Sequence, residues 1–471
     1  MNPLRCLMLL ICIFGLAVTT LGQSPAPGDD ALSAALAPSS PSYARVAPIA
    51  IDPSQPQALA VTSSTVLDFP AGADSSAAIF AAGNGASNSA AGGSGPGNAS
   101  EGRSSSSGEG DRSDVSTIDG LDSLATFSGA FINQAGPSLG KFFPFTMVGN
   151  HPALGGTTVI PAPITTVSLR LLNDDGSLNV AVPFKFADLF EDSPNFEESN
   201  YRSGQNLQYA DAVHRAQFFN VMGEDWHTVL KPQIVNSVTM NIPFHVNVRF
   251  PGNVIKPVQA YIVRTLPDGT HWVRLLDLLF NNLWFNQLVN DIKAGNITTN
   301  AISHMLFPNT YLFSIDKTGQ PAGCCVLGFH TYVYDPSVLP QPRWVTEYAS
   351  WISPGIFKGG FQDVTAMSHE VSEIFGDPFV NNATASWQFP GVPANAKACQ
   401  NNLEEGDPIE VLPTATVPLK LKERNEVFTY HPQIIPLLQW FEMGTKSNAI
   451  DGAFSFPDET TLKHSALPCP Q

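Results

Sequence analysis

From about residue 117 onward, the positions of apolar residues predict strands and helices that are interleaved along the chain. Residues 125–132 and 141–150, "ATFSGAFI" and "KFFPFTMVGN", are typical of paired strands around a turn that contains Gly and Pro. Residues 159–180 predict a mostly apolar strand followed by an Asp-Gly turn. Strand alternation returns at residues 237–252 and 258–269.

Other stretches have a helical period. Residues 211–222 show it, and residues 275–294, "LLDLLFNNLWFNQLVNDIKA", predict a strong helix that Gly295 stops. After this helix, residues 310–316 and 324–335 flank a turn and predict a hairpin. We therefore predict one α+β domain over residues 117–471.

The first 116 residues have a different character. Residues 1–22 combine Arg5, a short apolar stretch and small residues at its end, which predicts a secretory signal peptide; a retained anchor is the alternative. Residues 23–116 are rich in Ala, Ser, Gly and Pro, and this composition cannot bury enough apolar surface to offset the entropy of ordering. We predict a disordered, low-complexity tether with a short ordered piece at residues 64–72.

Hydropathy, charge and cysteines indicate the location and the partners. No later apolar stretch reaches about 18 residues, so we predict a secreted, soluble chain without a membrane span. A net charge of −17 argues against nucleic acid as a partner. Signal removal leaves Cys324, Cys325, Cys399 and Cys469. Pairing of Cys324 with Cys325 would strain the ring, so pairing of one of them with Cys399 is favoured. The oligomeric state is not indicated.

The strongest candidate chemistry lies in "SHEVSEIFGDP", residues 368–378. Asp363 can cap the start of a helix here, and Gly376 can adopt the left-handed conformation that ends one. Pro378 prevents continuation. Apolar residues at positions 364, 367, 371, 374 and 375 recur at helical spacing and form one stripe of the helix.

His369 and Glu373 lie one turn apart on the side opposite this stripe, with Glu370 beside them. The zinc-protease helix HExxH has the same arrangement, in which the residues at positions i and i+4 bind the metal and the Glu after the first ligand acts as general base toward the water. Because carboxylate oxygen is an acceptable zinc ligand, Glu373 can replace the second histidine. We predict a zincin-like catalytic domain with a mixed or antiparallel sheet and this active-site helix. The alternative is an amphipathic helix whose polar face is solvated and needs no metal.

The segments "SHEVSEIFGDPFVNN" and "CQNNLEEGDPIE" resemble the HExxE region of a family of secreted bacterial proteins of unassigned function that are metallopeptidase-like. They resemble the plant exordium (phosphate-induced) proteins more distantly. In this likeness Asp377 follows the helix in a turn, and Glu404 and Asp407 form a later Glu-x-x-Asp element. Pro408 stands where the plant pattern has a cysteine, so no disulfide arrangement follows from the resemblance.

A second likeness lies upstream, where Cys325, Phe329 and His330 resemble the Cys-x-x-x-Phe-His element of those proteins. Together the two likenesses imply a zinc-peptidase-like site. They do not specify which remote residue completes it.

Two ligands on one helix need a third from elsewhere in the chain. Glu404 is the first candidate because it follows the helix, as the remote glutamate does in thermolysin-like enzymes. Asp407 either binds the metal or orients His369. Asp377 either folds back as a ligand or is a turn or cap residue before Pro378. His330 is a candidate transition-state donor or alternative ligand, or else an ordinary packed histidine.

These observations predict a secreted zinc-dependent hydrolase of peptide or protein substrates. The predicted metal ligands are His369, Glu373, Glu404 and Asp407, and Glu370 is the catalytic base that passes a proton from water to the leaving amine. Carboxylate-rich ligation also suits other divalent cations and weakens their effect on bound water. The alternative is a non-catalytic extracellular binding or cell-surface protein with a structural or vestigial metal site.

Overall fold

The strands of the largest sheet come from distant parts of the chain. The computed structural model describes residues 46–51, 61–70, 124–200, 206–357, 360–388, 399–410, 412, 414–423, 426–444 and 462–465. The predicted signal peptide lies outside these residues. The described chain is mixed α+β, with more residues in strands than in helices.

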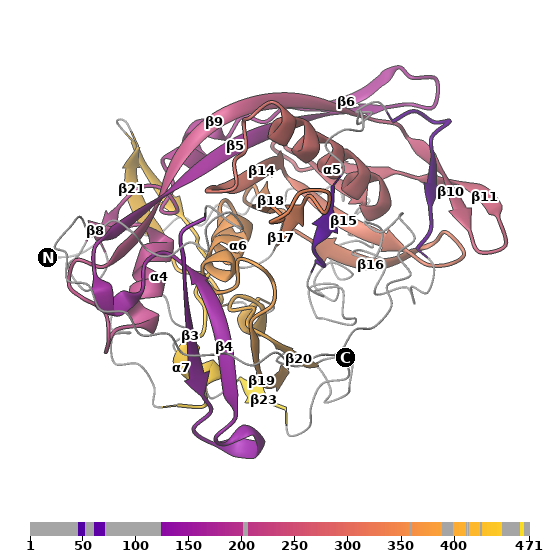
Figure 1. Cartoon of the computed structure of the whole chain (residues 1–471). Helices are drawn as coiled ribbons and strands as arrows, with labels where there is room; N and C mark the ends of the chain where they lie inside the picture. Colours follow the sequence, from indigo (N-terminus) through magenta and orange to yellow (C-terminus); the bar gives the residue numbers. More distant parts are fainter. Residues whose placement is uncertain are drawn as a thin grey trace, which may run out of the picture.

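A seven-stranded mixed sheet forms the centre (Figure 1). Its order is β1-β17-β18-β14-β5-β6, and β9 also pairs with β5. These strands are β1 (Ile49–Ala50), β5 (Thr157–Leu172), β6 (Leu178–Val182), β9 (His227–Ile242), β14 (Ile302–Pro308), β17 (Gly328–Tyr334) and β18 (Arg343–Trp351). The β17–β18 and β5–β6 pairs are antiparallel, whereas β14 pairs in parallel with both β18 and β5.

Two further sheets extend the side of the molecule that carries α5 (Asp277–Lys293), and four smaller ones complete the described fold (Figure 1). The first two are β11 (Val254–Gln259), β10 (His245–Phe250) and β2 (Val66–Asp68), and β12 (Tyr261–Thr265), β13 (His271–Leu276), β15 (Thr310–Ile315) and β16 (Pro321–Val326). The others are β20 (Cys399–Asn402), β19 (Ala383–Gln388) and β23 (Lys463–His464), with the pairs β3 (Thr126–Ile132) and β4 (Phe142–Val148), β7 (Ser199–Asn200) and β8 (Asn206–Leu207), and β21 (Leu419–Glu423) and β22 (Glu426–Tyr430).

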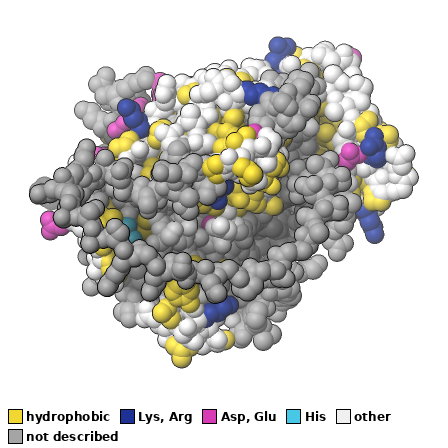
Figure 2. All heavy atoms as spheres, in the orientation of Figure 1, with side chains coloured by type: hydrophobic (Ala, Val, Ile, Leu, Met, Phe, Trp, Pro, Cys, Tyr) yellow, Lys and Arg dark blue, Asp and Glu magenta, His cyan; other side chains and the backbone are white. Residues whose placement is uncertain are grey.

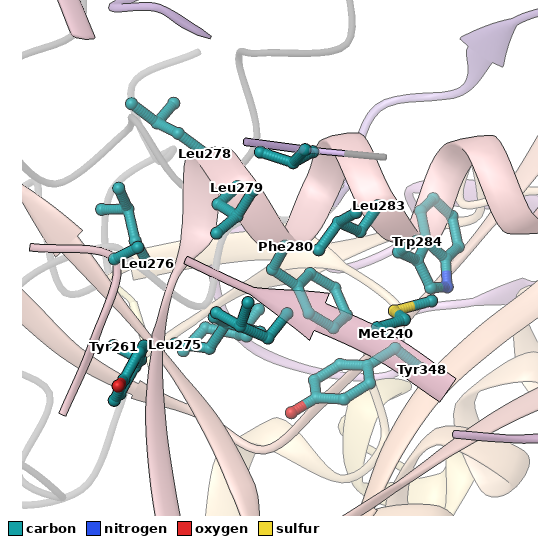
Figure 3. Packing of buried hydrophobic residues seen from close by; sticks show 14 of the residues in the cluster. Met240, Tyr261, Leu275, Leu276, Leu278, Leu279, Phe280, Leu283, Trp284 and Tyr348 are labelled. Carbon is teal, nitrogen blue, oxygen red and sulfur yellow. The ribbon is translucent and has the colours of Figure 1, made fainter. Parts of the chain in front are cut away.

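Helices pack on both faces of the central sheet. They are α3 (Ala187–Glu191), α4 (Tyr209–Gln217), α5 (Asp277–Lys293), α6 (Thr365–Gly376) and α7 (Leu438–Phe441), with 3-10 turns η1 (Gly136–Ser138), η2 (Pro152–Leu154) and η4 (Asp407–Ile409). On one face, Phe280 and Trp284 of α5 pack with Tyr348 of β18 in a large apolar core (Figure 3). On the other face, α6 packs against β17 and β18, with α4 beside it.

Alternation along the strands separates these two cores. In β14, Met305 and Phe307 point into the α5 core, whereas Ile302 and Leu306 point into the α6 core. His304 therefore lies on the α6 face, because side chains two residues apart on a strand share a face. His304 is the register partner of Glu347, which is in turn the partner of His330. The α6 face of the sheet thus carries a row of polar residues in its middle.

Several predicted elements are confirmed. Residues 126–132 and 142–148 pair as antiparallel β3 and β4, and β5 and β6 join through a turn at residues 173–177. The helix α5 ends two residues before Gly295, whose φ of 74° is the left-handed conformation that glycine adopts readily.

The predicted second strand of the hairpin at residues 324–335 is wrong in one respect. It is two strands, because β16 pairs with β15 in the four-stranded sheet and β17 pairs with β18 in the central sheet. Alternating apolar positions continue through both strands and do not reveal which sheet each one joins. The break places His330 on a strand of the central sheet that packs against α6.

The stretch predicted as a tether contains two described pieces that pair with the folded body. The expected ordered piece contains β2, which pairs in parallel with β10. Residues 49 and 50 form β1, which pairs with the edge of β17 and was not expected. The remainder of residues 23–116 lies outside the described residues.

The ends of α6 differ from the prediction. The helix begins at Thr365, and the Asp363 carboxylate accepts hydrogen bonds from the backbone amides of Val364 and His431 instead of occupying the N-cap position. Gly376 remains helical and is not left-handed. Its small size has another use, because a Cβ there would lie 2.7 Å from the Glu405 Oε1 atom.

Surface and covalent features bear on three other predictions. None of the helices in the described ranges is long and apolar enough to cross a membrane. On the face drawn in Figure 2, Lys and Arg side chains are scattered and form no continuous patch among the described atoms. Cys325 and Cys399 are both disulfide-bonded, which is compatible with the expected pairing.

Candidate metal centre

The polar face of α6 is buried. All twelve residues of the helix are inaccessible or nearly so, and the exposed fractions of His369, Glu370 and Glu373 are 8%, 5% and 3%. This excludes a surface helix with a solvated polar face. Charged groups are placed so deeply only when partners compensate the loss of water.

The segment from β20 through η4 covers one side of this polar face. Glu373 Oε1 accepts hydrogen bonds from the backbone N–H groups of Gly406 and Asp407, at 3.0 and 3.3 Å. The same oxygen lies 3.2 Å from His369 Nε2. Because the segment's own backbone holds this carboxylate, its orientation is fixed by the fold and not by a surface contact.

Gly406, which directly precedes η4 in this segment, approaches the His369 ring very closely. A Cβ at Gly406 would lie 2.5 Å from His369 Nδ1, which real Cβ atoms essentially never do. Gly406 has an ordinary helical backbone conformation, so its lack of a side chain serves this contact and no unusual turn. Its carbonyl also accepts a hydrogen bond from the Gln433 side chain at 2.8 Å, which holds the backbone in place.

The η4 turn adds two carboxylates to the His369 side. Asp407 Oδ1 lies 3.6 Å from His369 Nε2, and Gln400 donates a 2.8 Å hydrogen bond to the other Asp407 oxygen. In a 3-10 turn, residues i and i+3 lie on the same side, so Glu410 accompanies Asp407. His369, Asp407 and Glu410 each offer a ligand atom, all within 4.8 Å of one another.

Strand β17 covers the other side of the polar face. His330 Nδ1 lies 3.2 Å from Glu370 Oε2 and 3.4 Å from Glu373 Oε2. Its Nε2 atom points toward Glu404 Oε2 at 3.8 Å. His330, Glu370 and Glu373 form a second group of ligand atoms within 4.8 Å of one another. Glu373 therefore has one oxygen toward each imidazole.

Acidic groups outnumber basic ones in this buried region. Among the described residues, six carboxyl groups face or interact with the two imidazoles, so four negative charges would remain uncompensated if all six carboxyls and both imidazoles were ionised. The six belong to Glu370, Glu373, Glu404, Glu405, Asp407 and Glu410. An excess of this kind favours cations.

Without a cation, the proton affinities adjust to this excess. Burial raises the pKa of Glu370 to about 7 and that of Asp407 to about 6. Burial alone would lower the pKa of His369, but Glu373 and Glu370 raise it well above its usual value. Burial also opposes ionisation of Glu373, yet the two imidazoles hold its pKa below the usual range. Apart from Glu373, carboxyl and imidazole groups of this cluster therefore hold protons more tightly than usual, and a bound cation could replace those protons.

Ordinary histidine–carboxylate pairs in this chain are shorter than those of the cluster. His304–Glu347 and His431–Asp363 lie at 2.7 Å, within the range of charge-assisted hydrogen bonds. In the cluster, the imidazole-to-carboxylate distances run from 3.2 to 4.0 Å.

The longer distances suit ligands around one ion. Zinc–ligand bonds of about 2.0–2.2 Å in a tetrahedron separate the ligand atoms by about 3.3–3.6 Å. The distances from His369 Nε2 to Glu373 Oε1 and Asp407 Oδ1, 3.2 and 3.6 Å, agree with this spacing. The donor set of one imidazole and several carboxylates therefore fits zinc, or another divalent cation that accepts oxygen ligands.

The structure places the sequence-predicted residues in different parts of the cluster. His369, Glu373 and Asp407 come together, and Glu370 lies beside them. Glu404 lies on the His330 side, where the Asn402 amide donates a 3.0 Å hydrogen bond to its Oε1. The Asp377 carboxylate accepts hydrogen bonds from the backbone amides of residues 381 and 382, so it serves the turn after the helix.

Glu410 is a candidate ligand that sequence reasoning missed. The available signal was the sequence "GDPIE", in which a Pro directly after Asp407 favours a helical turn. Such a turn brings Asp407 and Glu410 to one side.

Comparison of the chain with models of protein families, with curated proteins and with solved structures found no match.

Proposed function

We propose that this chain is a secreted, metal-dependent hydrolase with a zincin-like active-site helix, acting on peptide-like amides. The observation that carries the proposal is the burial of the His369–Glu370–Glu373 face against a segment that adds further carboxylates. On an exposed helix, water would solvate the charged groups of an HExxE pattern. In this buried helix the charged groups lie at distances that suit metal ligands, so a bound cation would compensate them.

His369, Asp407 and Glu410 would hold the cation, and Glu373 Oε1 lies close enough to join them. A divalent cation there would polarise a substrate carbonyl and make water more acidic. The Gly406 and Asp407 amides keep Glu373 in place, and Gln400 orients Asp407. Such supporting contacts fix the ligand geometry.

Glu370 is the group that would move protons. Its Oε1 atom lies 4.0 Å from His369 Nε2, so it borders the ligand group without being part of it. From there the carboxylate would accept a proton from the attacking water at one oxygen and release it to the leaving amine. Several carboxylate ligands reduce the effective charge of the cation, so we expect slow turnover compared with a two-histidine site.

The proposal is tested with the purified chain, Zn²⁺ or Mn²⁺, and a mixture of quenched fluorogenic peptides of random sequence. Glu370→Gln should retain the metal and lose hydrolysis, because the amide keeps the shape but cannot take the proton. Glu405→Gln is the buried control, since Glu405 packs against Gly376 and belongs to neither ligand group. Hydrolysis that survives in Glu370→Gln would remove the mechanism.

A second candidate is a non-catalytic extracellular protein in which the cation is structural. It is favoured by the low accessibility of the ligands, since the His369 side chain is 10% exposed and that of Glu373 is 3% exposed. Structural metal sites are closed, whereas catalytic sites keep an open position. Tight metal binding without hydrolysis of any peptide in the mixture would support this candidate over the hydrolase.

A further inference from the structure

We propose that His330, Glu370 and Glu373 form a second cation site, joined to the first by the Glu373 carboxylate, and that its occupation inhibits hydrolysis. The site itself stands on its own contacts. Only the inhibitory effect rests on the proposed function, because that effect requires Glu370 to act as the base.

The geometry of the second group resembles that of the first. His330 Nδ1 lies 3.2 Å from Glu370 Oε2 and 3.4 Å from Glu373 Oε2, again longer than the chain's ordinary histidine–carboxylate pairs. The 3.4 Å distance lies within the separation of about 3.3–3.6 Å expected between zinc ligands in a tetrahedron, and the 3.2 Å distance, a hydrogen bond in this structure, lies just below it. All three side chains are at most 6% exposed, so water does not satisfy them.

The other nitrogen of the His330 ring is placed for a supporting contact. The buried Nε2 atom of His330 has no hydrogen-bond partner within the described ranges, although it faces Glu404 Oε2 at 3.8 Å. A histidine that binds a cation through one nitrogen commonly directs the other N–H at a carboxylate, which fixes the ring. Glu404 has the right position for this orienting role, and Asn402 holds it there at 3.0 Å.

Glu373 links the two groups. Its Oε1 faces His369 and its Oε2 faces His330, so one carboxylate presents an oxygen to each ligand group. Sites with two cations about 3.5–4 Å apart are built in this way. Two divalent cations would supply four positive charges to the six carboxyl groups, while the two imidazoles would bind them as neutral ligands.

The two sites should fill in sequence. The first cation repels the second, so the second equivalent should bind more weakly, by at least about tenfold. The His369 group should fill first because Glu410 belongs to it and the Gly406 segment has already arranged it. When the second cation binds Glu370 Oε2, that carboxylate is held as a ligand and is no longer free to take a proton from the attacking water.

The test is a titration of the metal-free full chain with Zn²⁺ by calorimetry, with metal content measured after gel filtration. We expect two equivalents for the wild type and one for His330→Gln and for His330→Ala. His304→Gln is the matched control, since His304 is also buried on the α6 face but belongs to neither ligand group, and it should still bind two. Circular dichroism checks the fold of each variant.

The outcomes separate this inference from the proposed function. One equivalent in the wild type, unchanged in both His330 variants, would overturn the second site and leave the hydrolase standing. Two equivalents without hydrolysis would support the site and remove the hydrolase. No binding at all would overturn both. If both proposals hold, hydrolysis rises with the first equivalent of Zn²⁺ and falls with the second, and His330→Gln loses the fall.

Discussion

Gly406→Ala is the most specific perturbation that the structure offers, because it adds one methyl group against one ligand. The new Cβ would lie 2.5 Å from His369 Nδ1 and 2.7 Å from both Cε1 and Cγ. Ordinary contacts begin at 3.4 Å, so the imidazole would have to retreat by about 0.9 Å, the difference between 3.4 and 2.5 Å. The backbone cannot yield instead without breaking its hydrogen bonds to Glu373 and Gln433.

A displacement of this size exceeds what metal coordination tolerates. Ligand distances in metal sites hold to within about 0.2 Å, so His369 should no longer complete the site. We expect Gly406→Ala to bind Zn²⁺ at least tenfold more weakly than the wild type, because even changes in supporting residues cost about 10- to 100-fold. The crowding itself should lower the free energy of unfolding by about 1–3 kcal/mol.

The assay is calorimetric titration with Zn²⁺, with chemical denaturation measured in parallel. Gly252→Ala is the control: its φ of 81° makes alanine strained, but nothing lies within 4 Å of the added Cβ. It should cost about 1–2 kcal/mol of stability and leave metal affinity unchanged. A Gly406→Ala chain that binds Zn²⁺ with wild-type affinity would refute the close packing of His369 against this segment.

Three other predictions concern stability. Asn382→Ala should lower the free energy of unfolding by roughly 3 kcal/mol, measured with denaturant, because the side chain exchanges two hydrogen bonds with the Thr146 backbone and donates another to the Gly376 carbonyl. Asn381→Ala is the control and should cost little, because Asn381 is exposed. Burial raises the pKa of Asp277 to about 7, so the wild type should lose up to roughly 4 kcal/mol relative to Asp277→Asn as the pH rises from about 4 to 7; a constant difference would contradict this. Saturation with Zn²⁺ at about one hundred times the dissociation constant should add about 2.7 kcal/mol to the free energy of unfolding, and an unchanged denaturation midpoint would count against a cation bound to the folded state.

Local patterns predicted much of the secondary structure because those elements follow from near neighbours in sequence. The β3–β4 pair and α5 have strong alternation or helical period, together with clear turn signals. The shared direction of His369 and Glu373 follows in the same way, from helix geometry alone. These features need no knowledge of distant contacts.

The parts that were missed depend on long-range packing. The period of α6 showed a polar face but could not show that the segment after β20 covers it. The position of His330 depends on the break between β16 and β17, which places the two strands in different sheets. Glu404 was favoured by its order along the chain and Glu410 was not considered, whereas the 3-10 turn brings Glu410 beside Asp407.

The central claim is that the buried cluster holds a divalent cation through His369. The most direct measurement is anomalous diffraction from crystals grown with Zn²⁺, recorded on both sides of the zinc absorption edge. We predict a peak about 2.0–2.1 Å from His369 Nε2, with the Asp407 and Glu410 carboxylates around it. An ordered cluster with no anomalous peak there, and the imidazole bonded directly to a carboxylate, would contradict the claim.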